Sequence, residues 1–89
     1  MENKILEKFN CKNIKISNCI DHTWRSGGYP QRRRQCWVSN ELVYDTRYDV
    51  EKITYEEFTA LWQHGRKIGA YNQEYNGLDG YDITYQFRL

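Results

Sequence analysis

Apolar and polar residues alternate without interruption over residues 81–89. The apolar set comprises Tyr81, Ile83, Tyr85, Phe87 and Leu89, and the positions between them are polar. Because successive side chains of a β-strand point to opposite faces, this pattern predicts a strand with one buried and one solvated face. Residues 70–75 precede it across a glycine-containing segment, and we expect them to form its hairpin partner.

Two further stretches have the composition of strands. Residues 13–20 carry isoleucine at alternate positions, which predicts a strand with one apolar face. Residues 34–46 are rich in aromatic and β-branched residues, and we expect a hairpin there whose turn lies at residues 40–41. With that turn, Trp37 lies opposite Tyr44 in the predicted ladder.

Helical periodicity is strongest over residues 54–65. The apolar face combines residues spaced three and four apart, namely Phe58, Leu61 and Trp62. Thr54 and Glu57 have the spacing of a capping box, in which each side chain binds the other residue's backbone amide. Gly65 is expected to end this helix in the left-handed conformation. A shorter pattern at residues 2–9 allows a second, N-terminal helix.

Together these elements predict an α+β fold. We expect a small antiparallel sheet of about four to five strands, built from two hairpins and packed against one main amphipathic helix. The length of 89 residues fits a single domain spanning residues 1–89. The sheet face away from the helix is expected to be solvated and rich in tyrosine, because the chain contains eight tyrosines.

The chain is unusually aromatic, and its charges are unevenly distributed. Phe, Trp and Tyr make up 16% of the residues, so we expect some rings to lie at a contact surface rather than in the core. The net charge is only +1, but residues 1–36 contain eight Lys or Arg and three Asp or Glu, whereas residues 37–89 contain five and nine. One interpretation is a basic contact surface. The other is that folding interleaves the two segments and removes the asymmetry.

Residues 21–31 are expected to form a long loop, because two glycines and a proline occur within residues 26–30. Arginines and aromatic residues surround it over residues 22–37. Arginine neutralises phosphates and exposed rings stack on unpaired bases, so this combination is typical of contacts with nucleic acid. The candidate binding residues are Trp24, Arg25, Tyr29, Arg32, Arg33, Arg34 and Trp37. The alternative is that these arginines protect an exposed strand edge.

No motif indicates catalysis, a metal or a cofactor. Three cysteines and no apolar N-terminal signal favour reduced thiols and a cytoplasmic protein. A zinc site needs ligands in close pairs. The candidate ligands are instead spread along the chain: Cys11, Cys19, His22 and Cys36. No apolar stretch reaches the length of a membrane span. We therefore expect a non-enzymatic protein with no metal, no cofactor and no membrane contact.

Two functions fit this sequence. The first is a small binding protein whose loop at residues 22–37 contacts nucleic acid. RNA is favoured over duplex DNA because the helix opens with Glu56 and Glu57, which repel phosphates. The second is an inhibitor or adaptor that binds a host protein such as a nucleic-acid-processing enzyme, as phage accessory or counter-defence proteins do. Its patch would combine acidic residues with Tyr44, Tyr48, Tyr71 and Tyr75. No pattern specifies an oligomeric state.

Overall fold

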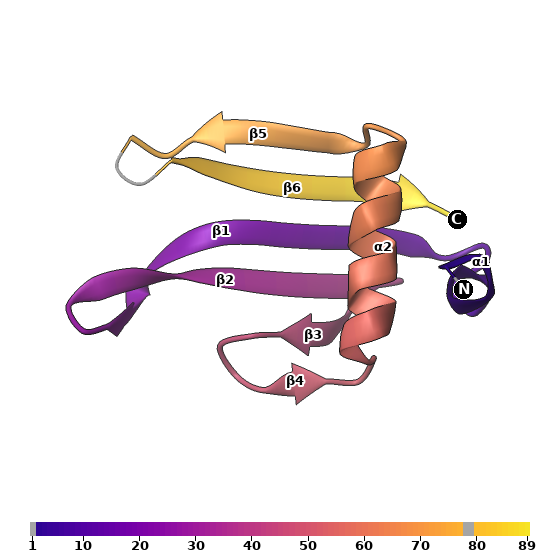
Figure 1. Cartoon of the computed structure of the whole chain (residues 1–89), viewed down its shortest axis with the longest axis horizontal. Coiled ribbons are helices and arrows are strands. Elements are labelled where there is room, and N and C mark those ends of the chain that lie inside the picture. Colours follow the sequence, from indigo (N-terminus) through magenta and orange to yellow (C-terminus); the bar gives the residue numbers. More distant parts are fainter. Residues whose placement is uncertain (1, 78–79) are drawn as a thin grey trace.

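The protein is an α+β fold built on one antiparallel sheet. A computed structural model describes residues 2–77 and 80–89 (Figure 1). Along the chain the elements are α1 (Glu2–Glu7), β1 (Asn13–Ser26), β2 (Tyr29–Val38), β3 (Glu41–Asp45), β4 (Val50–Glu51), α2 (Tyr55–Lys67), β5 (Tyr71–Tyr75) and β6 (Tyr81–Arg88). The predicted fold class is confirmed at this level, and so are the main helix and the short N-terminal helix.

The strands of the described residues form a single sheet in the order β4-β3-β2-β1-β6-β5. β1 lies near the centre and pairs with both β2 and β6, so strands from the two ends of the chain are neighbours. The described residues supply six strands to the sheet, slightly more than predicted. The strand that was missed is β4, whose two residues are too few to show an alternating pattern in the sequence.

β1 and β2 form one long hairpin, and the loop predicted for residues 21–31 is therefore wrong. Ser26 pairs with Tyr29, so only Gly27 and Gly28 remain in the turn. Both glycines have positive φ, 59° and 86°, as the tight turns of hairpins need. The glycines make a two-residue turn, and the polar residues on either side belong to strands. The pairing is interrupted by a bulge, since residues 22–24 lie between the pairs Asp21–Gln31 and Arg25–Pro30.

The hairpin of β2 and β3 has a different register from the predicted one. Its turn lies at Ser39 and Asn40, which both have positive φ, 50° and 69°. Trp37 consequently pairs with Leu42 and not with Tyr44, and a bulge shifts the pairs that follow. The prediction placed the turn one residue too late because a serine in the left-handed conformation is uncommon.

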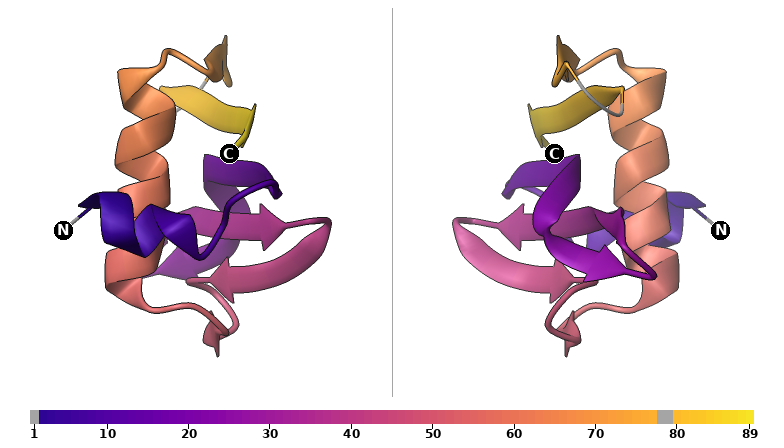
Figure 2. Two further views of the ribbon diagram at one scale, coloured as in Figure 1. Left: turned by 90° about the vertical axis from the view of Figure 1, so that its right-hand side faces the viewer. Right: turned by 90° about the vertical axis from the view of Figure 1, so that its left-hand side faces the viewer.

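α2 crosses one face of the sheet near one end of the strands, and α1 packs beside it (Figures 1 and 2). The predicted capping box is confirmed: Glu57 N donates to Thr54 Oγ1 at 3.0 Å, and Thr54 N donates to Glu57 Oε1 at 2.8 Å. The core lies between the helices and this face of the sheet. It comprises Leu6, Phe9, Ile14, Ile16, Cys36, Val43, Tyr44, Ile53, Phe58, Ala60, Leu61 and Tyr85.

Gly65 lies inside α2 instead of ending it, which corrects the prediction. The helix continues to Lys67, and Gly69, with a φ of 71°, adopts the left-handed conformation expected of Gly65. A Cβ atom at Gly65 would lie 2.8 Å from Phe87 Cε1 and 3.1 Å from Tyr85 Cδ2. Glycine is needed here because helix and sheet approach closely, and not because the helix stops.

Candidate nucleic-acid interface

α2 covers only one end of the sheet, and the strands extend well beyond it (Figure 1). We call the side that carries α2 the helix-side face. It is formed by the even-numbered residues of 14–20 in β1 and of 32–38 in β2, and by the odd-numbered residues of β5 and β6. The opposite side, the open face, takes the alternate positions. Past the helix, the helix-side face continues with a cross-strand row of Arg34, Asn18, Ile83 and Gln73, and then with the pairs Arg32–Ile20 and Tyr81–Tyr75.

A groove of about 650 Å³ runs between α2 and this part of the sheet. Trp62, Arg66 and Lys67 line it from the helix, and residues of β1, β5 and β6 line it from the sheet. Among residues 2–77 and 80–89, the lining includes two cationic side chains and no carboxylate. Positive charge in a concave site attracts anions more strongly than the same charge on an open surface. The groove is therefore suited to a negatively charged ligand.

Arg32 and Arg34 extend this positive surface along the sheet. Arg32 donates from Nη1 to Asn18 Oδ1 at 3.2 Å. The Arg34 guanidinium lies 5.4 Å from the centre of the Trp62 ring, which is a cation–π contact. Arg34 Nε and Trp62 Nε1 are both covered and find no hydrogen-bond acceptor in the described part of the chain.

Exposed tyrosines complete the helix-side face. Tyr71, Tyr75 and Tyr81 are 47%, 64% and 52% exposed. The rings of Tyr75 and Tyr81 meet edge to face with centroids 5.4 Å apart, while Tyr71 packs at 5.6 Å against the buried Tyr85. The prediction that the tyrosines line the face away from the helix is wrong. They share the helix's side of the sheet and remain exposed because α2 covers only one end of that side.

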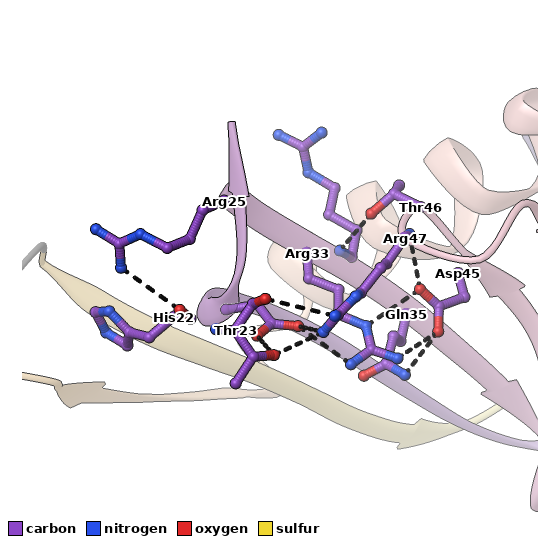
Figure 3. Close-up of polar contacts among 10 residues, drawn as sticks. His22, Thr23, Arg25, Arg33, Gln35, Asp45, Thr46 and Arg47 are labelled. Atoms are coloured by element: carbon purple, nitrogen blue, oxygen red, sulfur yellow. Dashed lines mark hydrogen bonds and ion pairs between the residues drawn. The ribbon is translucent and has the colours of Figure 1, made fainter. Parts of the chain in front are cut away.

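Arg33 lies on the open face, apart from its two neighbours in sequence. Its Nη2 donates to Asp45 Oδ2 at 2.7 Å and its Nε to Asp45 Oδ1 at 3.2 Å, while Nη1 lies 3.4 Å from Asp21 Oδ2. Arg47 joins the network by donating from Nη1 to Asp21 Oδ2 at 2.8 Å (Figure 3). The Tyr48 ring centre lies 5.1 Å from both guanidinium groups. The two arginines are thus neutralised within the protein.

The carboxylates of this network are held in the charged form. Burial alone would raise the pKa of Asp45, but hydrogen bonds from Arg33 and from the Arg47 backbone help to lower that pKa below its ordinary value. The pKa of Asp21 falls to about 2, chiefly through the hydrogen bond from Thr23, with burial opposing and Arg47 assisting. Arg33 thus joins β2 to β3 through Asp45 and to β1 through Asp21, and its positive charge is balanced within the protein.

The other residues selected from the sequence lie away from the groove. Trp24, Arg25 and Tyr29 belong to the end of the long hairpin, where the described part of β1 pairs only with β2. Arg25 Nη2 donates to the carbonyl of the second turn glycine at 2.7 Å, and Tyr29 is 74% exposed. Trp37 lies on the open face with Lys15 Nζ 5.2 Å from its ring centre. The structure therefore divides the predicted site among the groove side, the open face and the hairpin tip.

The tyrosine patch considered for a partner protein does not form one surface. Tyr44 is buried and stacks on Phe58 with ring centroids 4.4 Å apart. Tyr48 belongs to the arginine network of the open face. Tyr71 and Tyr75 lie on the helix-side face with the groove.

Sequence reasoning missed the groove residues on α2. Trp62 belongs to the predicted apolar face of the helix, and Arg66 and Lys67 come after Gly65, where the helix is predicted to end. One signal was present, since Arg66 follows Trp62 by four residues and so lies on the same side of the helix. The partner strands that close the groove cannot be recognised from that spacing.

The cysteines and acidic residues give no sign of a reactive or metal-binding centre. Burial raises the pKa of the Cys36 thiol to about 12, so this thiol stays protonated at neutral pH. Across residues 2–77 and 80–89, no three His, Cys, Asp or Glu side chains cluster as metal ligands. In the same part of the chain, no helix is long and apolar enough to cross a membrane.

The fold and the groove define a small α+β sheet protein with a basic, aromatic surface beside its helix. No protein-family model, no curated protein and no solved structure matches the chain. Its function must therefore be inferred from the surface itself.

Proposed function

We propose that this protein is a non-enzymatic binder of single-stranded nucleic acid, RNA in preference to duplex DNA, and that it binds on the helix-side face. The observation that carries this proposal is the groove, which places Arg66 and Lys67 beside Trp62 and Tyr71, with no carboxylate among the described residues of its lining. The sequence alone predicted a binding site over residues 22–37. The proposed site is instead the helix-side face.

Phosphates and bases would meet different parts of the face. Arg66 and Lys67 are exposed at the end of α2 and can contact the phosphates of a strand lying in the groove. Tyr75 and Tyr81 offer exposed rings on which unpaired bases can stack. A duplex hides the faces of its bases, so these tyrosines contribute only to the binding of a single strand.

Amide side chains in the groove favour RNA. Asn18, Gln63 and Gln73 all line it. An amide can donate and accept hydrogen bonds, which matches the 2′-hydroxyl group that distinguishes RNA from DNA. The first turn of α2 carries Glu56 and Glu57, so this end of the helix repels the phosphates of a duplex.

The double variant Arg66→Gln/Lys67→Gln is expected to bind an unstructured, labelled RNA oligonucleotide about tenfold more weakly than the wild type. The slope of log affinity against log salt should flatten by about 1.4, because each lost phosphate contact on a single strand contributes ~0.7. Tyr75→Ala/Tyr81→Ala should weaken binding by about 1–3 kcal/mol per stacked base and leave the salt slope unchanged. Fluorescence anisotropy titrations at several salt concentrations measure both effects.

The matched control is Lys15→Gln/Arg88→Gln, which removes the same charge from the open face. It should bind within about twofold of the wild type, because these charges lie across the sheet from the groove and are screened by salt. Equal losses in the groove variant and the control would mean that binding follows net charge, and would reject the groove as the site. Equal affinity for single-stranded RNA and for duplex DNA of the same length would reject the strand preference.

A partner protein is the second candidate, and the tip of the β1–β2 hairpin is the feature that favours it. The tip presents Trp24 and Tyr29, residue types enriched at protein interfaces, on a turn braced by Arg25. If this reading holds, a polypeptide captured from a host lysate should survive RNase treatment and be lost with Tyr29→Ala. A captured polypeptide that RNase removes, and that Tyr29→Ala retains, is bridged by RNA and supports the first candidate.

A further inference from the structure

Within the part of the chain that the structure describes, β5 is an edge strand with β6 as its one neighbour in the sheet. All of its residues are exposed. Gln86 N donates to Ala70 O at 3.0 Å and Asn76 N donates to Gly80 O at 2.9 Å, so the hydrogen-bonded pairs of this hairpin fall on even-numbered residues. The backbone N–H and C=O groups of the odd-numbered residues therefore point away from β6. These residues are Tyr71, Gln73 and Tyr75.

The composition of this edge does not protect it from pairing with another strand. Edge strands are commonly guarded by lysine, proline or a bulge. Residues 71–75 contain neither lysine nor proline, Glu74 is their one charged side chain, and their register with β6 is regular. β4 at the other edge of the sheet has only two residues and offers a much shorter template.

We propose that two copies of this chain form a dimer by pairing their β5 strands antiparallel about a two-fold axis at Gln73. In this register Tyr71 of one copy lies opposite Tyr75 of the other, and Asn72 lies opposite Glu74. Odd-numbered residues meet odd-numbered residues, so every outward-facing backbone group of β5 obtains a hydrogen-bond partner.

The side chains are self-complementary in this one register. The tyrosines form aromatic cross-strand pairs, and the Asn72 amide can donate to the Glu74 carboxylate of the second copy. Moving the axis to Glu74 would place two carboxylates opposite each other. Moving it to Asn72 would leave Tyr75 beyond the paired segment. This self-complementarity is the reason for choosing a second copy, rather than an unrelated peptide, as the occupant of the edge.

The dimer joins two sheets into one continuous sheet. Residues opposite each other in an antiparallel ladder share a face, so both α2 helices lie on the same side and the interface tyrosines link the two helix-side faces. The strand pairing is independent of nucleic-acid binding. Only its consequence, a surface over which one RNA strand can contact both copies, rests on the proposed function.

Charge substitutions at Asn72 test this register. Asn72 is exposed, and its even-numbered position places its side chain on the open face, away from the groove. Asn72→Glu introduces two like-charged pairs across the interface, whereas Asn72→Lys introduces two oppositely charged pairs. The dimer dissociation constant should rise with the first variant and fall with the second, by roughly two- to thirtyfold in each case. The double variant Asn72→Glu/Glu74→Lys should restore dimerisation, and sedimentation velocity over a concentration series measures all of these.

Hydrogen exchange provides a second measurement on the unmodified chain. The amides of Tyr71, Gln73 and Tyr75 should exchange more slowly at high protein concentration, and those of Asn72 and Glu74 should not change. A wild type that sediments as a monomer up to millimolar concentration overturns the proposal. Asn72→Glu and Asn72→Lys shifting dimerisation in the same direction overturns it as well. A dimer that does not bind RNA rejects only the proposed function, and a monomer that binds RNA rejects only the dimer.

Discussion

Replacing Asp45 by alanine is expected to lower the free energy of unfolding by about 3–5 kcal/mol. The Asp45 side chain has 0% exposure and accepts hydrogen bonds from Arg33 at 2.7 Å, from Gln35 Nε2 at 3.0 Å and from Arg47 N at 2.9 Å. Its loss leaves Arg33, whose side chain is only 20% exposed, short of a counter-charge. Domains of this size are typically stable by about 5–13 kcal/mol, so urea denaturation will resolve the change easily.

The control for Asp45→Ala lies on the same strand. Glu41 pairs with Lys52 at 2.9 Å, but both side chains are about 60% exposed, and such surface pairs contribute less than ~1 kcal/mol. Glu41→Ala should therefore leave the denaturation midpoint almost unchanged. Equal losses from Glu41→Ala and Asp45→Ala would mean that the buried network does not stabilise the fold.

Acid unfolding gives a second readout of the Asp45 variant. A carboxylate whose pKa is lowered by folding stabilises the native state fully above its ordinary pKa, and this stabilisation is lost as the pH falls through the lowered value. The pKa of Asp21 is lowered to about 2 and that of Asp45 is also lowered. The wild type should lose stability from about pH 4 downward, and Asp45→Ala should lose less over that range because one contributing carboxylate is absent.

Phe58→Ala is the second substitution with a large expected effect, a loss of about 3–5 kcal/mol in the free energy of unfolding. Phe58 is 1% exposed, stacks on Tyr44 at 4.4 Å and lies 6.1 Å from Trp62 between ring centroids. The cavity would open where α2 meets β3, since the ring fills the space between them. Thermal or urea denaturation measures the loss. RNA binding should weaken too, because α2 carries Trp62 and its neighbours in the groove.

Tyr55→Ala is the matched control for Phe58→Ala. Tyr55 begins the same helix and is 64% exposed, so its truncation should change stability by less than ~0.5 kcal/mol. A similar loss from both variants would indicate that aromatic content in α2, and not the packing of Phe58 against Tyr44, supports the helix.

The elements that could be predicted from the sequence are those whose causes are local. Thr54 and Glu57 satisfy each other's backbone amides within one helical turn, so their spacing alone predicts the start of α2. β6 is recognisable because apolar and polar residues alternate strictly over residues 81–88. The buried face that this pattern predicts forms only in part, since Tyr85 is buried whereas Tyr81 remains exposed. In both cases the residues that carry the signal are also the residues that form the structure.

The errors concern positions whose meaning depends on residues far away in sequence. In the sequence, Gly65 looks like a glycine that ends a helix. In the structure, glycine is required at this position because the rings of Phe87 and Tyr85 leave no room for a side chain. Gly27 and Gly28 resemble a flexible loop, but they form a turn because the strands on either side of them pair. Serine is rarely found in a hairpin turn with positive φ, so Ser39 was not recognised as part of the turn. The predicted register of β2 and β3 is therefore wrong by one residue.

The candidate site, too, depends partly on the local sequence and partly on contacts between residues distant in the chain. The sequence alone indicates that arginines and aromatic rings are abundant and that α2 begins with two acidic residues. Tertiary structure decides which of these residues act together. Alternation along β2 sends Arg32 and Arg34 to one face and Arg33 to the other, where two aspartates from other strands neutralise it.

By itself, the sequence determines the fold class, the start of α2, the strand β6 and the supply of cationic and aromatic side chains. It determines them because capping, alternation and composition act within a few residues. Only the tertiary structure decides that α2 crosses one end of the sheet, that a groove opens beside it, and that the edge of β5 is left exposed. These features arise from pairing and packing between segments that are distant in the chain. They leave no pattern within a few residues from which they could be predicted.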